Sequence, residues 1–125
     1  FAKDYKTLIN EISKSVFLYS PIAFKSPYPD QASTCFPTKT FDYILAGRPI
    51  FVHAPKNFFY TKYMKNYDSA YISCSTDPVY LLRDVIKFLN DISYQKRVKI
   101  NAEMMLKSGH LRSQVQRILL QKISN

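Results

Sequence analysis

Glycine is nearly absent from this chain of 125 residues, which contains only Gly47 and Gly109. Phosphate-binding loops of the P-loop and dinucleotide-binding kinds need several glycines close together, because their backbone approaches the phosphate closely. Both kinds of loop are therefore excluded within these residues. Tryptophan is missing too, but ten tyrosines and nine phenylalanines keep the aromatic share at 15%.

Cysteine and long hydrophobic runs are also scarce. Cys35 and Cys74 are too few for a disulfide framework, and no spacing of cysteine and histidine resembles a metal site. We therefore expect a reducing, cytoplasmic location and no metal. The apolar runs are too short to span a membrane. The chain starts with Phe1, with no charged and then apolar leader after it, so we expect a piece of a longer chain.

Acidic residues are outnumbered two to one, with 9 Asp and Glu against 18 Lys and Arg and a net charge of +9. Much of the excess comes after position 95, where Glu103 is the single acidic residue. This balance favours anionic partners, namely nucleotides, nucleic acid or an anionic membrane surface touched from the inner side. The simpler interpretation is a solvated helix face.

Apolar patterns of the helical and the strand type alternate along the chain. Short β-prone runs predict buried strands at 16–19, 49–53 and 69–73. Helical spacing predicts helices over 3–14 and 37–47, from 55 onward, over 78–89 and 93–107, and after Gly109. This order predicts an α/β fold in one domain, 1–125, with a small parallel sheet of about three strands between helices, Rossmann-like, and two closing helices.

Several helix ends and buried faces follow from the same patterns. Asp77 is expected to cap a helix in which Pro78 takes the first position, and Thr34 to cap the helix that begins at Pro37. Two helices have expected buried stripes: Leu81, Leu82, Val85, Ile86 and Leu89 in the first, and Leu111, Val115, Ile118 and Leu119 in the last.

The segment with recognisable chemistry runs from Phe36 to Ile50 and reads Phe-Pro-Thr-Lys-Thr-Phe-Asp-Tyr-Ile-Leu-Ala-Gly-Arg-Pro-Ile. A loop leads into a helix N-terminus, where backbone N–H groups and the helix dipole favour an anion. Thr38 and Thr40 add hydroxyl donors there, and Lys39 adds a cation. The Asp42 carboxylate, one turn later, can accept hydrogen bonds from a vicinal diol. Phosphate and ribose beside each other describe a nucleotide site.

This segment resembles the signature of GT-B glycosyltransferases of the group 1 (family 4) type. Pro37-Thr38-Lys39 is similar to the family's Pro-Ser-Lys turn, Asp42-Tyr43 to its Glu-Tyr, and Gly47-Arg48-Pro49-Ile50 to its Gly-x-Pro-Val close. Asp77-Pro78 and the Leu-rich helix after it resemble a later element of the family. The expected order of elements matches over most of the chain.

The resemblance implies the nucleotide-sugar-binding C-terminal lobe of such an enzyme, truncated at its N-terminal side. It implies Asp42, at the place of the family's glutamate, as the ribose ligand, and Thr38 and Lys39 as residues against the donor's diphosphate and sugar. Thr34 stands where many members have another glutamate. The candidate binding residues are thus Thr34, Thr38, Lys39 and Asp42; the catalytic residues stay unassigned.

The resemblance also implies the reaction and the partners. A hexosyltransferase would move a sugar from the nucleotide-sugar donor to a glycan or lipid-linked acceptor, as in cell-envelope polysaccharide synthesis. The donor is a substrate, so no cofactor is expected. The missing N-terminal lobe is the other partner, and without it the 125 residues should be inactive.

Two other classes of function stay open at this point. A basic nucleic-acid-binding module would need an exposed sheet or a helix-turn-helix, whereas these strands are expected to be buried on both faces, so nucleic acid is not expected as a partner. An α/β interaction domain without a small ligand is the third class. For single residues, Asp42 as an ordinary solvent-facing residue and His53 as a structural histidine are the simpler alternatives.

Overall fold

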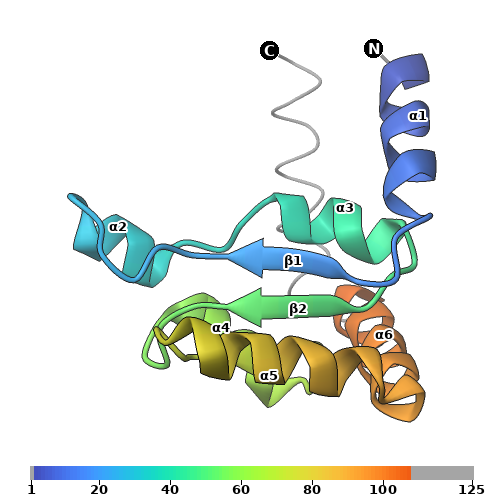
Figure 1. Ribbon diagram of the computed structural model, residues 1–125. Helices are drawn as coiled ribbons and strands as arrows, with labels where there is room; N and C mark the ends of the chain where they lie inside the picture. The colour runs from blue at the N-terminus through green and yellow to red at the C-terminus, as the bar shows by residue number, and fades with distance from the viewer. Residues whose placement is uncertain (1, 108–125) are drawn as a thin grey trace.

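The computed structural model describes residues 2–107, in which three parallel strands are flanked by helices (Figure 1). The expected α/β class and the small parallel sheet are confirmed. The elements, in chain order, are α1 (Ala2–Ile12), β1 (Leu18–Pro21), α2 (Pro29–Thr34), α3 (Lys39–Leu45), β2 (Ile50–His53), α4 (Phe59–Asn66), β3 (Tyr71–Ser73), α5 (Pro78–Leu89) and α6 (Ile92–Lys107).

The strands follow one another across the sheet in the order β1-β2-β3. Leu18 lies opposite Ile50, and Phe51 lies opposite Tyr71. The central strand β2 is apolar at successive positions, and Ile50, Phe51 and Val52 are all fully buried. A parallel strand with no polar side needs cover on both faces, because its side chains alternate between them.

Each face of the sheet has its own apolar cluster. Ile50 and Val52 pack with residues of α3 and α4, among them Ile44 and Met64. Phe51 points to the other face and packs against Phe88 of α5, with further aromatic rings around them. The crossover helices α3 and α4 therefore cover one face, and α5 covers the other.

Helix α6 contributes to both clusters. Val98 packs with Phe51 and Phe88, whereas Ala102 and Met105 belong to the cluster on the α3 side. In Figure 1 the arrowheads of β1 and β2 point toward α2, and α6 lies at the opposite end of these strands. The helix thus crosses the edge at which the strands begin, which we call the amino edge.

Strand β1 begins two residues later than expected. Val16 is exposed, and the pairing starts where the Leu18 N–H donates to the Pro49 oxygen at 2.9 Å. Leu18 and Ser20 are buried while Tyr19 is exposed. The polar Ser20 can be buried in this strand because its hydroxyl forms a hydrogen bond with a buried tyrosine, described below.

The buried side of α5 differs from the expected stripe. Leu81 and Val85 lie against the sheet as predicted, but the third position on that side is the fully buried Phe88. Leu82, Ile86 and Leu89 are exposed. This helix is apolar on two sides, and the aromatic rings below Phe88 decide which side is buried. The cap was predicted correctly: Asp77 Oδ1 accepts from the Val79 N–H at 2.9 Å, and Pro78 begins the helix.

The remaining expected elements have mixed outcomes. The helix predicted from residue 55 begins at Phe59, whose side chain is exposed. The helix over 93–107 is confirmed as α6. The last helix, after Gly109, lies outside the described residues. Within residues 2–107, no helix is both long enough and apolar enough to cross a membrane.

Candidate functional site

The three strands end side by side at Pro21, His53 and Ser73, and we call this the carboxyl edge. The chain leaves it through the segments 22–38, 54–58 and 74–77. Because α3 connects parallel strands, it begins at this edge and runs back toward the amino edge. The crevice beyond the carboxyl ends of the strands is where open α/β sheets bind their ligands.

An aromatic cluster fixes the path of the chain into α3. The ring of Phe36 lies 5.5 Å from that of Phe41, 5.0 Å from Tyr60 and 5.5 Å from Tyr63. Just before it, α2 packs against α4. The sequence patterns predicted no element between the strand at 16–19 and the helix at 37–47, so α2 was missed. Side-chain packing therefore holds the approach to α3 in place.

A buried chain of three hydroxyl groups lies below the start of α3. The Thr40 hydroxyl donates to the Tyr60 hydroxyl at 2.9 Å, and Ser20 and Tyr60 share a second hydrogen bond of 2.9 Å. Burial raises the pKa of Tyr60, so the phenol stays neutral. Thr40 was expected to offer its hydroxyl to a ligand. This expectation is wrong, because Thr40 is fully buried and its hydroxyl is used inside the protein.

Thr38 and Lys39 stand exposed at the beginning of α3. Thr38 is the residue before the first helical one, and its side chain forms no capping hydrogen bond. Lys39 forms no ion pair within residues 2–107. A cation in a first helical turn is unfavourable to the helix itself. A free hydroxyl and a free ammonium group are therefore presented together at the carboxyl edge.

Thr34 is not the cap of this helix. It is the last residue of α2, and its hydroxyl donates to the Asp30 oxygen at 2.8 Å. The cap prediction failed because residues 29–34 form a helix of their own, and the residue before α3 is Thr38, four positions later. Thr34 is exposed and belongs to a different element from Thr38 and Lys39.

Asp42 is held by α1 and is half-buried. Its Oδ1 accepts a hydrogen bond from the Tyr5 hydroxyl at 2.8 Å. Burial, together with this bond and the nearby carboxylate charge, raises the pKa of Tyr5 to about 12. Asp42 is thus not an ordinary solvent-facing residue. Its second oxygen accepts no hydrogen bond from any residue in the range 2–107.

His53, at the end of β2, has a partner at each ring nitrogen. Nδ1 lies 2.5 Å from the Tyr19 hydroxyl, and Nε2 lies 2.7 Å from the Ser75 backbone oxygen. A carbonyl oxygen only accepts, so Nε2 carries the proton, and the Tyr19 O–H can donate to Nδ1. Partial desolvation of its hydroxyl raises the pKa of Tyr19, which keeps its proton in place. The arrangement agrees with the structural interpretation of His53.

Gly47 closes the segment that carries the resemblance. Its φ is +72°, a left-handed conformation that other residues rarely adopt. Space does not require glycine here, since an added Cβ would meet its nearest atom, Lys99 Cε, at 3.7 Å. The glycine is therefore required by the turn that ends α3 and leads into β2.

A groove that the sequence did not reveal runs beside β3 and has a volume of about 670 Å³. Its lining residues lie far apart in the sequence, on α4, on β3 and its flanks, and on α6. The lysines at 56, 62 and 65 are the part of the groove that the sequence could have indicated. That all three line one groove depends on how α4 packs, which the sequence pattern does not show. Within residues 2–107, no cluster of three or more His, Cys, Asp or Glu could hold a metal ion.

Comparison with known proteins adds no relationship to this geometry: no family model, no curated protein and no solved structure matches the chain.

Proposed function

We propose that this chain is the nucleotide-sugar-binding part of a glycosyltransferase of the GT-B type. The observation that carries the proposal is the place of the segment 36–50 in the fold. It forms the first crossover of a parallel sheet, with its turn at the carboxyl edge and its glycine at the amino edge. Ligand-binding turns occupy this place in open α/β sheets.

The order of the strands supports the proposal. Three adjacent parallel strands in sequence order, joined by crossover helices, are the arrangement of one mononucleotide-binding half of a doubly wound sheet. In the proposed enzyme, the other half of the sheet and the acceptor-binding lobe would belong to the rest of a longer chain. It places the reaction in the cytoplasm, with a contact at the inner face of the membrane as a further part of the proposal.

The roles of the candidate residues follow from the groups that they leave free. Lys39 and the Thr38 hydroxyl would contact the diphosphate of the donor. Asp42 would accept a ribose hydroxyl at the oxygen that Tyr5 does not use. Thr34 can take part only as an acceptor, because its proton is donated to Asp30. No residue in the range 2–107 is proposed as the catalytic base.

Titration of the 125-residue chain with UDP, GDP and ADP, followed by amide NMR, tests the proposal. We expect one of the three to shift the signals of residues 36–42, with those of α5 unchanged. A short RNA should cause no such shift. An RNA that binds with a steep salt dependence, or no response to any nucleotide, would overturn the proposal.

Two substitutions separate a ligand contact at Asp42 from its role in holding α1. Asp42→Ala should weaken nucleotide binding by about tenfold to a hundredfold, because a charge-assisted hydrogen bond contributes roughly 1.5–3 kcal/mol. Tyr5→Phe removes the bond to α1 but keeps the carboxylate, so affinity should be retained. If both variants lose affinity equally, Asp42 acts through α1 and the assignment is wrong. Asp42→Glu should bind at least as well as Asp42→Ala.

A further inference from the structure

The groove beside β3 is independent of the site proposed above. Its floor contains the side chains of Ala70 and Ile72, and Cys74 lies at the end near the carboxyl edge. Helix α4 forms one wall, with Thr61, Lys62 and Lys65, and Tyr94 of α6 closes the other end. The groove therefore follows β3 along its length and joins the two edges of the sheet.

Strand β3 lies at the end of the sheet and pairs on one side alone within the described part of the chain. The Ser73 oxygen accepts from the Ala54 N–H at 3.2 Å, so Ser73 directs its backbone groups toward β2. Backbone groups alternate in direction along a strand. The N–H and C=O of Ile72 thus point away from β2, and no residue within 2–107 forms a hydrogen bond to them. They are free to pair with a further strand.

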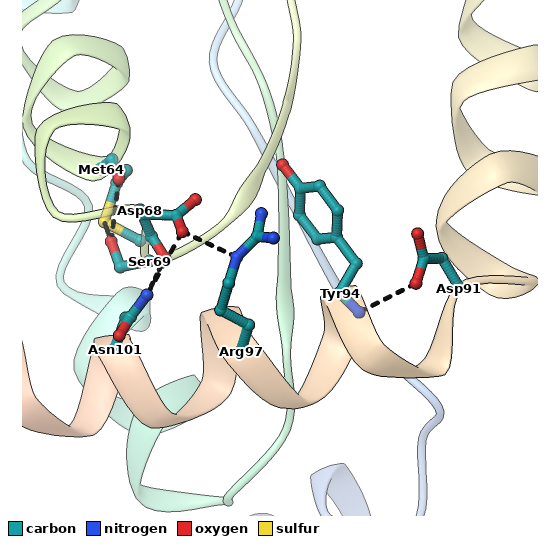
Figure 2. Close-up of polar contacts among 7 residues, drawn as sticks. All are labelled: Met64, Asp68, Ser69, Asp91, Tyr94, Arg97 and Asn101. Atoms are coloured by element: carbon teal, nitrogen blue, oxygen red, sulfur yellow. Dashed lines mark hydrogen bonds and ion pairs between the residues drawn. The ribbon is translucent and has the colours of Figure 1, made fainter.

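Polar contacts between α6 and Asp68 hold the turn at the amino-edge end of the groove (Figure 2). Asp68 has a φ of +49°, and Asn101 Nδ2 donates to its backbone oxygen at 3.0 Å. Arg97 Nε lies 2.8 Å from Asp68 Oδ2, and the guanidinium group stacks on the Tyr94 ring at 4.3 Å. Tyr94, Arg97 and Asn101 project from one side of α6 toward this turn.

The charge of the groove is positive. Within residues 2–107, Asp68 is the single carboxylate of its lining, and Arg97 already pairs with it. Lys56, Lys62 and Lys65 are exposed and form no ion pair within residues 2–107. Lys65 and Lys56 act on Cys74, whose pKa is raised by burial and lowered in part by these charges. Three lysines without an ion-pair partner among the described residues therefore line the groove.

We propose that this groove binds an acidic peptide in an extended conformation, which adds to the free edge of β3. Main-chain hydrogen bonds to Ile72 would supply affinity, as in other cases of strand addition. The small apolar floor would take every second side chain, and the lysines would pair with acidic side chains.

Nucleic acid fits this groove less well. Arginine is over-represented where a phosphate is recognised through two parallel hydrogen bonds, and unpaired bases stack on an exposed aromatic face. Among the described residues, the lining contains no arginine and one aromatic residue, Tyr94, on whose ring Arg97 stacks. The apolar floor instead suits the side chains of a strand.

The test uses a short fluorescent peptide that alternates glutamate and valine, with binding measured by fluorescence anisotropy. Lys62→Glu with Lys65→Glu should weaken binding by at least about tenfold, which corresponds to 1.4 kcal/mol. The matched control is Lys87→Glu with Lys107→Glu, which also reverses exposed helix lysines but outside the groove. The control should stay within about twofold of the unchanged chain. Thermal unfolding of each variant shows that it is folded.

Methylation of the peptide backbone tests the strand pairing without changing the protein. In one peptide, methyl groups on every second amide nitrogen block one edge of the strand. In a second peptide, the methyl groups are moved by one residue, to the other register, and leave that edge intact. One register should abolish binding while the other preserves it. Equal binding of both registers, no binding of the acidic peptide, or tighter binding of the lysine–valine counterpart or of a short RNA would each overturn the proposal. Apart from RNA binding, which also tests the nucleotide proposal, none of these results bears on nucleotide binding at α3.

Discussion

The two edges of this sheet are built in opposite ways. At the amino edge, α6 crosses the strand ends, Asp68 is held by Arg97 and Asn101, and Arg48 Nε donates to the Ser13 oxygen. At the carboxyl edge, the segments after the strands carry exposed residues such as Thr38 and Lys39. Among the described residues there, the side chain of His53, at the end of β2, links Tyr19 of β1 to Ser75, which follows β3.

This difference separates stability from binding. Groups at the amino edge have their partners within the protein, so changes there should act on folding. Groups at the carboxyl edge are held in position by the aromatic cluster and the hydroxyl chain behind them, and keep free donors and acceptors. Binding residues on segments that a rigid sheet positions are a common arrangement.

Removal of a core ring near the amino edge should have the largest effect. Phe88→Ala empties a fully buried position that contacts the rings of Phe17, Phe51 and Tyr71, so it should cost about 3–5 kcal/mol of unfolding free energy. Phe24→Ala removes a half-buried ring beside His53 at the other edge and should cost about 1 kcal/mol. Urea unfolding measures both, and equal losses would contradict the comparison.

Alkaline pH should weaken the amino edge next. Burial and the nearby Asp84 raise the pKa of Tyr71 to about 12, above its ordinary value of 10. The folded state therefore holds the phenol proton more tightly than the unfolded state does. The stabilisation is complete below pH 10 and is lost as the pH rises toward 12. Tyr71→Phe should flatten the fall of unfolding free energy over this range, and Tyr80→Phe, exposed on α5, should leave it unchanged.

Loss of the ion pair at Asp68 should cost less. Arg97→Ala removes a pair whose side chains are about half exposed, and also the contact with Tyr94. We expect a loss of about 1 kcal/mol, because exposed ion pairs and cation–π contacts each contribute little. The melting temperature at low and high salt measures it. A loss that salt does not reduce would show that packing, and not charge, holds this turn.

The smallest effect on folding is expected at Lys39. Lys39→Ala should change the unfolding free energy by less than about 0.5 kcal/mol, with a slight gain because the charge opposes the helix dipole. The same variant should weaken nucleotide binding if the proposed site is right. Chemical unfolding and nucleotide titration on one sample give both values. A marked loss of stability would make Lys39 a structural residue.

Local patterns were enough to predict the sheet and several helix ends. Alternating helical and strand-like segments gave three parallel strands, and Asp77-Pro78 gave the start of α5, because both signals depend on neighbours in the sequence. The side on which α5 is buried needed tertiary information. Leu82 and Phe88 are both apolar, and the rings of the sheet select Phe88.

The candidate site was predictable in part. The position of Thr38 and Lys39 at the start of α3 could be predicted, because the sequence shows a turn at Pro37 that leads into a helix. The partner of Asp42 does not, because Tyr5 lies 37 residues away in the sequence. Thr40 is buried, and Thr34 is the last residue of α2, because of contacts with α4. Local patterns in the sequence do not contain these contacts. The groove at β3 was missed for the same reason.

The hydroxyl chain of Ser20, Thr40 and Tyr60 also bears on how the protein folds. Its two bonds join residues 40 and 20 positions apart, from β1, α3 and α4. Each needs α4 to pack against an element much earlier in the chain, and the closing of such non-local loops is slow. The chain of hydroxyls should therefore form late, after the folding transition state. It would then slow the unfolding of the finished sheet without speeding its assembly.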